Sequence, residues 1–378
     1  MSVITIDYTP AYEQGGGIGR YVRDLVAALA DIDEQQHYCL FVAGAAHSQL
    51  PQAPGCNFIW KPTKFSALWL ARLWHRAHLP LPIETFTGAI DLYHATDFVL
   101  PPTHPNTRTL LTVHDLSFVR VPETASPNLK AYLDAVVPRS IKRATHVLAD
   151  SQATKDDLVA LYNTSPEKIT VLLSGVDSRY KRVDDSQAQA AVREKYQLGS
   201  RPYSFSIGTV QPRKNYSRLI RALAQLRAEG HDLALVIAGG RGWLEDEMYQ
   251  TLREVRMQDY VHLIGFADES DLPALYSGAL CTTFPSLYEG FGLPVLESMA
   301  CGTPVVTSNV SSLPEVAGNA ALQVNPYDLE AITDAVRRII NDYALREDLI
   351  ERGYQQARRF TWEDSARQLQ VIYRDLLA

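Results

Sequence analysis

The chain has 378 residues, 46% of them hydrophobic and 21% charged, with a formal net charge of −7. This length fits about two domains of ordinary size, and the composition is typical of a globular protein. The negative charge argues against a nucleic-acid partner, and no apolar run reaches the roughly 18 residues that cross a membrane. Four scattered cysteines and the absence of a signal sequence lead us to expect reduced thiols and a cytoplasmic location.

Short β-branched runs alternate with helical patterns along the first half of the chain. Helix-like segments at Ile18–Ala30 and Ala131–Ala144 lie between runs that read as strands. This alternation indicates a parallel sheet with helices on both faces. The strands predicted here are Val3–Ile6, Tyr38–Val42, Leu92–His94, Thr109–Val113, His146–Ala149 and Ile169–Leu172.

The second half repeats the pattern, so we predict an α/β protein of two Rossmann-like domains, residues 1–180 and 181–361, whose parallel sheets face each other across a cleft. The tail, residues 362–378, reads as an amphipathic helix capped by Thr361. Periodicity alone does not say what surface it covers. The strands predicted in this half are Tyr203–Ile207, Ala234–Ala238, Val261–Ile264, Ala279–Thr283, Val305–Thr307 and Ala321–Val324.

The segment from Pro285 to Glu297 places two carboxylates eight positions apart across a glycine-containing turn. Glu289 lies beside Gly290 and Gly292, where backbone N–H groups can approach an anion. Glu297 lies near the start of the following helix. Amides directed at phosphate and carboxylates directed at hydroxyls would hold a sugar nucleotide from both ends.

Two further motifs follow predicted strands. Arg213 and Lys214 are adjacent cations after Tyr203–Ile207, and such a pair neutralises a diphosphate; the alternative is an exposed basic pair. Gly15–Arg20 opens the first long helix, where glycines let amides approach a phosphate or a polyol; the alternative is a tight turn. It lacks the spacing of a dinucleotide fingerprint.

His114 directly follows the strand Thr109–Val113. A histidine at a strand end can exchange hydrogen bonds with a sugar hydroxyl. The alternative is a packing histidine held by Asp115. Elsewhere, His75 and His78 have no carboxylate or cysteine nearby in the sequence, so no metal site is predicted.

The segment Lys61–Pro80 mixes aromatic and apolar residues with Lys and Arg. Two interpretations stay open. An aromatic, basic amphipathic helix can lie in a membrane interface. An ordinary helix that covers the sheet and has solvated basic ends would give the same pattern.

Taken together, these motifs resemble those of the group 1 (family four) retaining glycosyltransferases, which have the GT-B fold. The segment from Pro285 to Glu297, followed by Ala300–Val305, matches their glutamate-x7-glutamate motif. The likeness extends through Gly208–Asn215, Val113–Leu116, Gly15–Arg20 and Ser174–Asp177. Within the family, the chain is similar to bacterial mannosyltransferases that build O-antigen and related polysaccharides, on the residues Gly17–Arg23, Val113–Phe118 and Gly208–Asn215.

The resemblance implies roles for the matching residues. Arg213 and Lys214 would bind the donor diphosphate, and Glu297 the ribose. The C-terminal helix would pack back on the first domain. The implied catalytic residues are His114, Glu289, Arg213 and Lys214. The implied donor-binding residues are Gly16, Gly17, Arg213, Lys214, Glu289, Gly290, Phe291, Gly292, Leu293 and Glu297.

The resemblance also implies the reaction. We expect a hexose to pass with retention from a nucleoside diphosphate sugar, GDP-mannose as first choice, to a saccharide or lipid-linked saccharide, without a cofactor or metal. UDP-glucose and UDP-N-acetylglucosamine stay open as donors, as does a non-catalytic nucleotide-sugar-binding protein. A lipid-linked acceptor would bring the protein to the inner membrane surface; the oligomeric state is open. Thr209 and Ser174 depart from the family, where Arg and Asn are usual.

Overall fold

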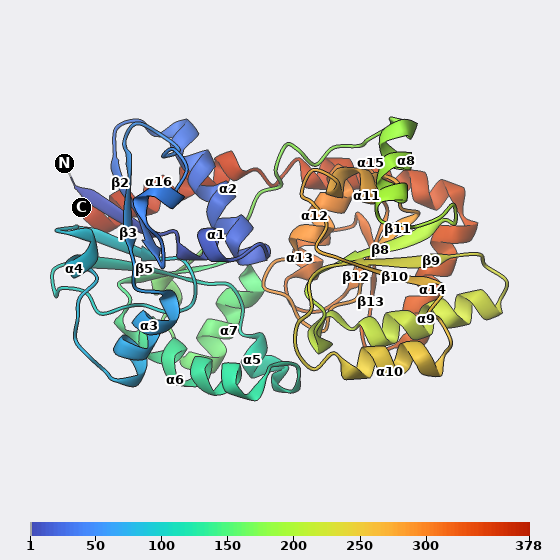
Figure 1. The fold of residues 1–378 in the computed structure, drawn as a ribbon, viewed down its shortest axis with the longest axis horizontal. Helices are drawn as coiled ribbons and strands as arrows, with labels where there is room; N and C mark the ends of the chain where they lie inside the picture. The colour runs from blue at the N-terminus through green and yellow to red at the C-terminus, as the bar shows by residue number, and fades with distance from the viewer. Residues whose placement is uncertain (1) are drawn as a thin grey trace. The chain divides into compact units, whose positions relative to one another are not determined.

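The computed structural model describes residues 2–378, which form two compact units, each built on a parallel sheet (Figure 1). Unit 1 comprises the chain up to Leu116, together with Ala131–Gly175 and Thr361–Ala378. Unit 2 comprises Ser117–Lys130 and Val176–Phe360. The prediction of two parallel-sheet, Rossmann-like domains is therefore confirmed.

The sheet of unit 1 has seven parallel strands in the order β3-β2-β1-β4-β5-β6-β7. The six strands predicted from the sequence are all present. The prediction missed β3, which contains Pro62 and lies at the sheet edge, where a residue without an N–H is tolerated. The strands are β1 Val3–Asp7, β2 His37–Ala43, β3 Phe58–Thr63, β4 Leu92–Ala95, β5 Arg108–Val113, β6 His146–Ala149 and β7 Ile169–Val171.

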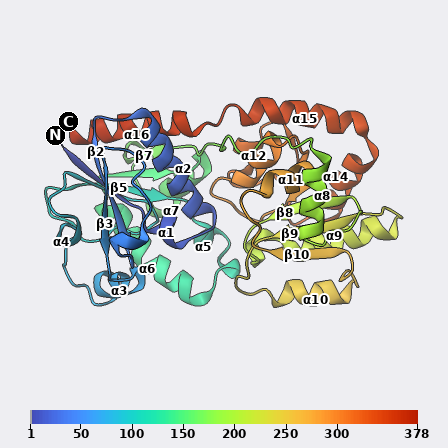
Figure 2. The same ribbon diagram turned by 45° about the horizontal axis from the view of Figure 1, so that its top comes forward.

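Helices cover this sheet, and the last of them comes from the end of the chain. The hydroxyl of Thr361 accepts a hydrogen bond from the backbone N–H of Asp364, so the predicted cap of this last helix is confirmed. It packs against α2 (Figure 2). The helices are α1 Thr9–Glu13, α2 Gly17–Ile32, α3 Ala67–Ala71, α4 Glu84–Thr87, α6 Pro127–Arg143 (whose residues 127–130 belong to unit 2), α7 Gln152–Tyr162 and α16 Trp362–Leu377, with short turns η1 His47–Gln49, η2 Arg72–Arg76 (a π-helix) and η4 Pro166–Lys168.

Unit 2 contains six parallel strands in the order β10-β9-β8-β11-β12-β13. All six were predicted, and only β11 lies about two residues later than expected. The reason is that Ala279 and Leu280 belong to the turn that follows α11. The strands are β8 Tyr203–Ile207, β9 Ala234–Ala238, β10 Val261–Gly265, β11 Cys281–Phe284, β12 Val305–Ser308 and β13 Ala321–Val324.

Two buried apolar clusters fill the interior of unit 2. One involves α9, α10 and α14, and the other involves α8 and α11. The sheet is thus enclosed by helices, as its uninterrupted apolar strands require. The helices are α5 Ser117–Arg120, α8 Ser186–Lys195, α9 Tyr216–Ala228, α10 Asp246–Glu254, α11 Leu272–Ser277, α12 Leu293–Ala300, α13 Leu313–Ala317, α14 Leu329–Asn341 and α15 Tyr343–Ala357, with turns η3 Pro122–Thr124 and η5 Pro212–Lys214.

The compact units differ from the predicted limits, 1–180 and 181–361, in three places. Thr361 belongs to unit 1, whereas residues 176–180 and residues 117–130 belong to unit 2. The second stretch is tied there by the Trp243 indole, whose Nε1 donates to the carbonyl of Thr124 at 2.7 Å. Among residues 2–378, no helix combines the length and the apolar content needed to cross a bilayer.

Candidate active site

The predicted basic pair and the first predicted carboxylate lie on two loops of unit 2 that meet. Arg213 and Lys214 follow β8, and Glu289 follows β11. These two strands are hydrogen-bonded neighbours in the parallel sheet, so their carboxyl ends lie at the same edge. The backbone N–H of Leu287 donates to the carbonyl of Arg213 at 2.8 Å and joins the loops.

Glu289 forms an ion pair with each cation. Its Oε2 lies 2.6 Å from Nη1 of Arg213, and its Oε1 lies 2.7 Å from Nζ of Lys214. The three side chains are only 10% to 15% exposed. Burial alone would raise the pKa of Glu289, but the charges of Arg213 and Lys214 outweigh burial and lower it to about 2. The result is a largely buried cluster with a formal charge of one positive unit, which we call the Glu289 triad.

Neighbouring side chains fix the triad in place, and sequence reasoning gave them no role. Asn215 adopts a left-handed conformation and donates to the carbonyls of Pro285 and Pro326 at 2.9 and 2.7 Å. The Ser311 hydroxyl accepts from the N–H of Glu289, and the Ser312 hydroxyl donates to its carbonyl, each at 2.9 Å. The position of Asn215 beside the basic pair was a usable signal. Ser311 and Ser312 offered none.

Two glycines at the ends of adjacent strands let the backbone come close here. Gly208 and Gly239 both have φ of +146°, which side-chain-bearing residues rarely adopt. A Cβ on Gly239 would lie 2.1 Å from the carbonyl oxygen of Gly208. The Lys214 stem passes beside Gly208, and its Nζ lies 4.6 Å from the centre of the Phe284 ring. The Lys214 side chain is therefore held along its whole length.

The remaining predicted donor-binding residues of this segment lead into α12. Gly292 is the N-cap of this helix with φ of +118°, and Gly290 and Phe291 are buried, while Leu293 is partly exposed. Glu297 is 1% exposed and accepts a hydrogen bond from the Tyr276 hydroxyl at 2.7 Å. In this structure Glu297 thus contacts α11, and its role toward a ribose stays a prediction.

His114 lies in unit 1 and is buried among polar partners. Its Nδ1 lies 2.7 Å from Oδ2 of Asp150, and its Nε2 lies 2.8 Å from the carbonyl oxygen of Thr96. Burial would lower the pKa of His114, but the charge and hydrogen bond of Asp150, followed by the charge of Asp97, raise it to about 9. The ring is an imidazolium held by Asp150, not by Asp115 as the alternative interpretation had it. A sugar contact would have to replace one of these bonds.

This pairing predicts how stability depends on pH. Because the pKa of His114 is raised from 6.5 to about 9 on folding, the charged ring stabilises the protein below pH 6.5 and the contribution disappears as pH rises through about 9. We expect the melting temperature of the wild type to fall faster over this window than that of His114→Gln, measured by calorimetry. Parallel curves would contradict the assignment.

Gly16 and Gly17 lie at the N-terminal end of α2, also in unit 1. Gly16 is its N-cap and Gly17 its first residue, and a Cβ on either would meet no atom within 4 Å. At Gly19, by contrast, a Cβ would lie 2.0 Å from the carbonyl oxygen of Gln14. Packing therefore requires glycine at position 19 but not at 16 or 17, where the open backbone suits the predicted ligand contact.

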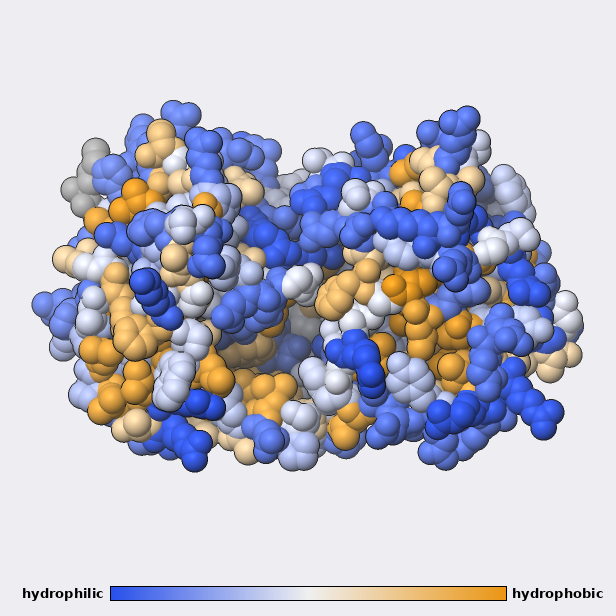
Figure 3. Space-filling model, viewed as in Figure 1, coloured by the Kyte–Doolittle hydropathy of each residue, from blue (hydrophilic) through white to orange (hydrophobic). Residues whose placement is uncertain are grey.

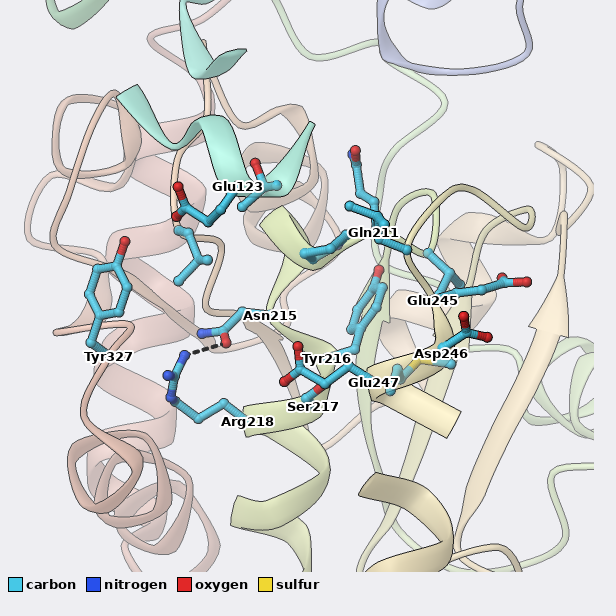
Figure 4. Close-up of a pocket in the computed structure, with 16 residues that line it drawn as sticks. Glu123, Gln211, Asn215, Tyr216, Ser217, Arg218, Glu245, Asp246, Glu247 and Tyr327 are labelled. Atoms are coloured by element: carbon cyan, nitrogen blue, oxygen red, sulfur yellow. Dashed lines mark hydrogen bonds between the residues drawn. The ribbon is translucent and has the colours of Figure 1, made fainter. Parts of the chain in front are cut away.

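A separate cavity of about 510 Å³ lies within unit 2 at the N-terminal end of α9 (Figure 4). Gln211 and Tyr216 line it, next to Arg218, whose Nη1 donates to Oδ1 of Asn215. Its carboxylates outnumber its cations, which disfavours a diphosphate there. The carboxylates that line this cavity are those of Glu123, Glu245, Asp246 and Glu247. Across residues 2–378, no group of three or more His, Cys, Asp or Glu side chains is arranged to hold a metal ion.

Comparison with solved structures defines the class of fold. Over 100% of this chain and 99% of the other, the structure is similar to sucrose-phosphate synthase from Thermosynechococcus elongatus, with a TM-score of 0.77 at 23% identity. It is also similar to WaaG, a glycosyltransferase involved in lipopolysaccharide biosynthesis, with a TM-score of 0.72 at 18% identity and coverage of 98% and 99%. The two parallel-sheet units thus have the GT-B fold of glycosyltransferases.

Sequence comparison gives the family. Residues 188–356 match the model of the glycosyl transferases group 1, and residues 15–180 match that of glycosyltransferase family 4. O-antigen chain mannosyltransferase B of Escherichia coli is 32% identical over 95% of this chain and 96% of its own. The O-antigen chain mannosyltransferase RfbU of Salmonella typhimurium is 30% identical over 63% of this chain and 65% of its own. The chain belongs to the group 1, family 4 glycosyltransferases, as the resemblance predicted.

Proposed function

We propose that this glycosyltransferase moves a mannosyl group, with retention, from GDP-mannose to a saccharide or lipid-linked saccharide in cell-surface polysaccharide synthesis. The observation that carries the proposal is the Glu289 triad, which places two cations beside a carboxylate at the carboxyl edge of one sheet. The choice of mannose rests on the likeness, over nearly the whole chain, to an O-antigen chain mannosyltransferase.

In the proposed reaction the triad acts on the leaving group. Arg213 and Lys214 stabilise the charge that develops on the diphosphate as the bond from sugar C1 to the phosphate oxygen breaks. The acceptor hydroxyl forms the new bond at C1 from the same face, and its proton passes to the departing phosphate oxygen. The protein's own cations do what a divalent ion does in other transferases, so neither a metal nor a cofactor takes part.

A donor panel tests the proposal. Purified full-length protein is incubated with GDP-mannose, UDP-glucose or UDP-N-acetylglucosamine and a mannose-containing acceptor, with and without a chelator, and released nucleotide is measured. We expect release from GDP-mannose, unchanged by the chelator, and an α-linked product by NMR. Preference for a UDP-sugar would replace the donor. Binding without turnover would favour a nucleotide-sugar-binding protein, and inversion or chelator sensitivity would refute the mechanism.

The segment Lys61–Pro80 favours a contact with an anionic membrane surface, at the cytoplasmic face if the acceptor is lipid-linked. It holds four Lys or Arg and no Asp or Glu, in a chain of net charge −7. Phe65, Leu68 and Trp69 are each more than half exposed, and the guanidinium of Arg72 lies 5.1 Å from the Trp69 ring centre. Figure 3 shows apolar surface gathered on the part of unit 1 that carries α3, with hydrophilic side chains beside it.

Vesicle sedimentation tests this contact. Aromatic side chains favour the interface, and each nearby Lys or Arg adds on the order of 1 kcal/mol on an anionic surface. We expect the full-length protein to sediment with phosphatidylglycerol-containing vesicles at low salt, and Leu68→Ala/Trp69→Ala to do so several-fold less. Tyr343→Ala, at an exposed aromatic of unit 2, is the control. Equal sedimentation of both variants would contradict the membrane contact and favour the other interpretation, an ordinary helix that covers the sheet.

A further inference from the structure

The two cations that would hold the donor diphosphate already have an anionic partner in the protein. Each oxygen of Glu289 is taken by one of them, at 2.6 Å from Arg213 and 2.7 Å from Lys214. Nη1 of Arg213 also donates to the carbonyl of Tyr288 at 2.6 Å. A diphosphate that approaches these cations therefore meets a carboxylate engaged with the same donor groups.

We propose that Glu289 is an internal counter-ion of the diphosphate site, which holds Arg213 and Lys214 in position and limits how tightly a nucleoside diphosphate is bound. The inference rests on the proposed function, because it assigns the diphosphate to this cation pair. Without Glu289 the pair would carry two positive charges, whereas the triad carries one. Glu289 thus has a positioning role in addition to any contact with the sugar.

The surroundings of the triad make this effect strong. The three side chains are largely shielded from water, so charges a few ångströms apart interact far more strongly than on the surface. The backbone of Glu289 is fixed by Ser311 and Ser312, so its carboxylate stays near the cations. With its pKa lowered to about 2, Glu289 is charged throughout the neutral range, and the effect is permanent rather than a pH switch.

A limit on diphosphate affinity has a kinetic use. The donor and the nucleoside diphosphate product share the diphosphate group, so cations that bind it too tightly also retain the product. Binding energy that is equal for the substrate and the transition state does not raise kcat, and product release is rate-limiting in many enzymes. A carboxylate that weakens both complexes by the same factor therefore favours turnover.

The test measures affinity for two probes, inorganic pyrophosphate and GDP, by calorimetry on the full-length protein. Glu289→Gln keeps the shape of the side chain and removes its charge. We expect pyrophosphate to bind it about tenfold more tightly than the wild type, equivalent to about 1.4 kcal/mol. Inhibition by GDP should strengthen similarly, although transfer becomes slower. If Glu289 only maintained the structure of the site, Glu289→Gln would instead bind both pyrophosphate and GDP more weakly than the wild type.

Three further variants make the result specific. Glu245→Gln is the matched control, because the Glu245 carboxylate pairs with Arg241 outside the triad. This variant should bind pyrophosphate as tightly as the wild type does. Glu289→Asp keeps the charge and should not bind pyrophosphate more tightly. If Glu289→Gln does not fold, Glu289→Ala serves in its place. Melting curves give a second measure of the same affinity. Pyrophosphate should raise the melting temperature of the variant that lacks the Glu289 charge more than it raises that of the wild type.

The outcomes separate the inference from the proposed function. Wild-type binding of pyrophosphate with equal or weaker binding by Glu289→Gln overturns the counter-ion role alone. If the wild type binds neither pyrophosphate nor GDP, the diphosphate site itself is wrong, and the proposed function falls with it.

Discussion

Replacing Lys214 by methionine is expected to lower the transfer rate on the order of 10²-fold or more, with the protein still folded. Methionine keeps the apolar stem that lies along Gly208 and Phe284 and removes only the charge. The loss falls on kcat because the charge of the leaving diphosphate is greatest in the transition state. Steady-state kinetics with the preferred donor, together with a melting curve, measure both effects.

The matched control is Arg221→Ala, which removes a cation on α9 that pairs with Glu254 at the surface. Its rate should stay within about twofold of the wild type, because surface ion pairs contribute little. A Lys214→Met enzyme that keeps more than half of the wild-type kcat would refute the role of Lys214 in stabilising the leaving group. An equal loss in Arg221→Ala would show that only the net charge of the unit matters.

The fold was predictable where strands are buried on both faces. Such strands read as short, continuous apolar runs, as Ala234–Ala238 and Val305–Ser308 do. β3 lies at the edge and contains Pro62, so its sequence does not resemble that of a buried strand. The parallel order that brings β8 and β11 together is a property of the folded sheet, which periodicity cannot reveal.

The candidate site was predictable only in part, for the same reason. Arg213, Lys214 and Glu289 were identified because each follows a predicted strand. Their ion pairs, however, join two loops that are far apart in the sequence, because Glu289 lies 76 positions after Arg213 and 75 after Lys214. The partner of His114 is Asp150, 36 positions away, and the local candidate Asp115 was wrong. Contacts of this kind become visible only when the strand order is known.

His94 shows how far such contacts reach. This residue ends the predicted strand Leu92–His94 and is fully buried, with Nδ1 2.7 Å from the Tyr373 hydroxyl and Nε2 2.8 Å from the Thr112 hydroxyl. Burial, followed by the charge of His114, lowers the pKa of His94 to about 3, so the ring is neutral. It links the central sheet of unit 1 to α16, 279 positions along the chain.

Truncating the buried face of α16 should destabilise unit 1 and leave unit 2 unchanged. Leu369 is 1% exposed on the face that packs against α2, and a buried Leu→Ala replacement costs about 2–5 kcal/mol. We expect Leu369→Ala to lower the free energy of unfolding of unit 1 by this amount. Hydrogen exchange read by mass spectrometry locates the effect, because peptides of α2 should exchange faster while those of α9 should not.

Val371→Ala is the control on the same helix, because Val371 is 42% exposed and its loss should change stability by less than about 0.5 kcal/mol. Equal effects of the two replacements, or faster exchange in α9, would contradict the placement of α16 in unit 1. The comparison separates two reasons for a C-terminal helix. A helix that merely ends the chain would tolerate both changes. A helix that completes the core of unit 1 would tolerate Val371→Ala but not Leu369→Ala.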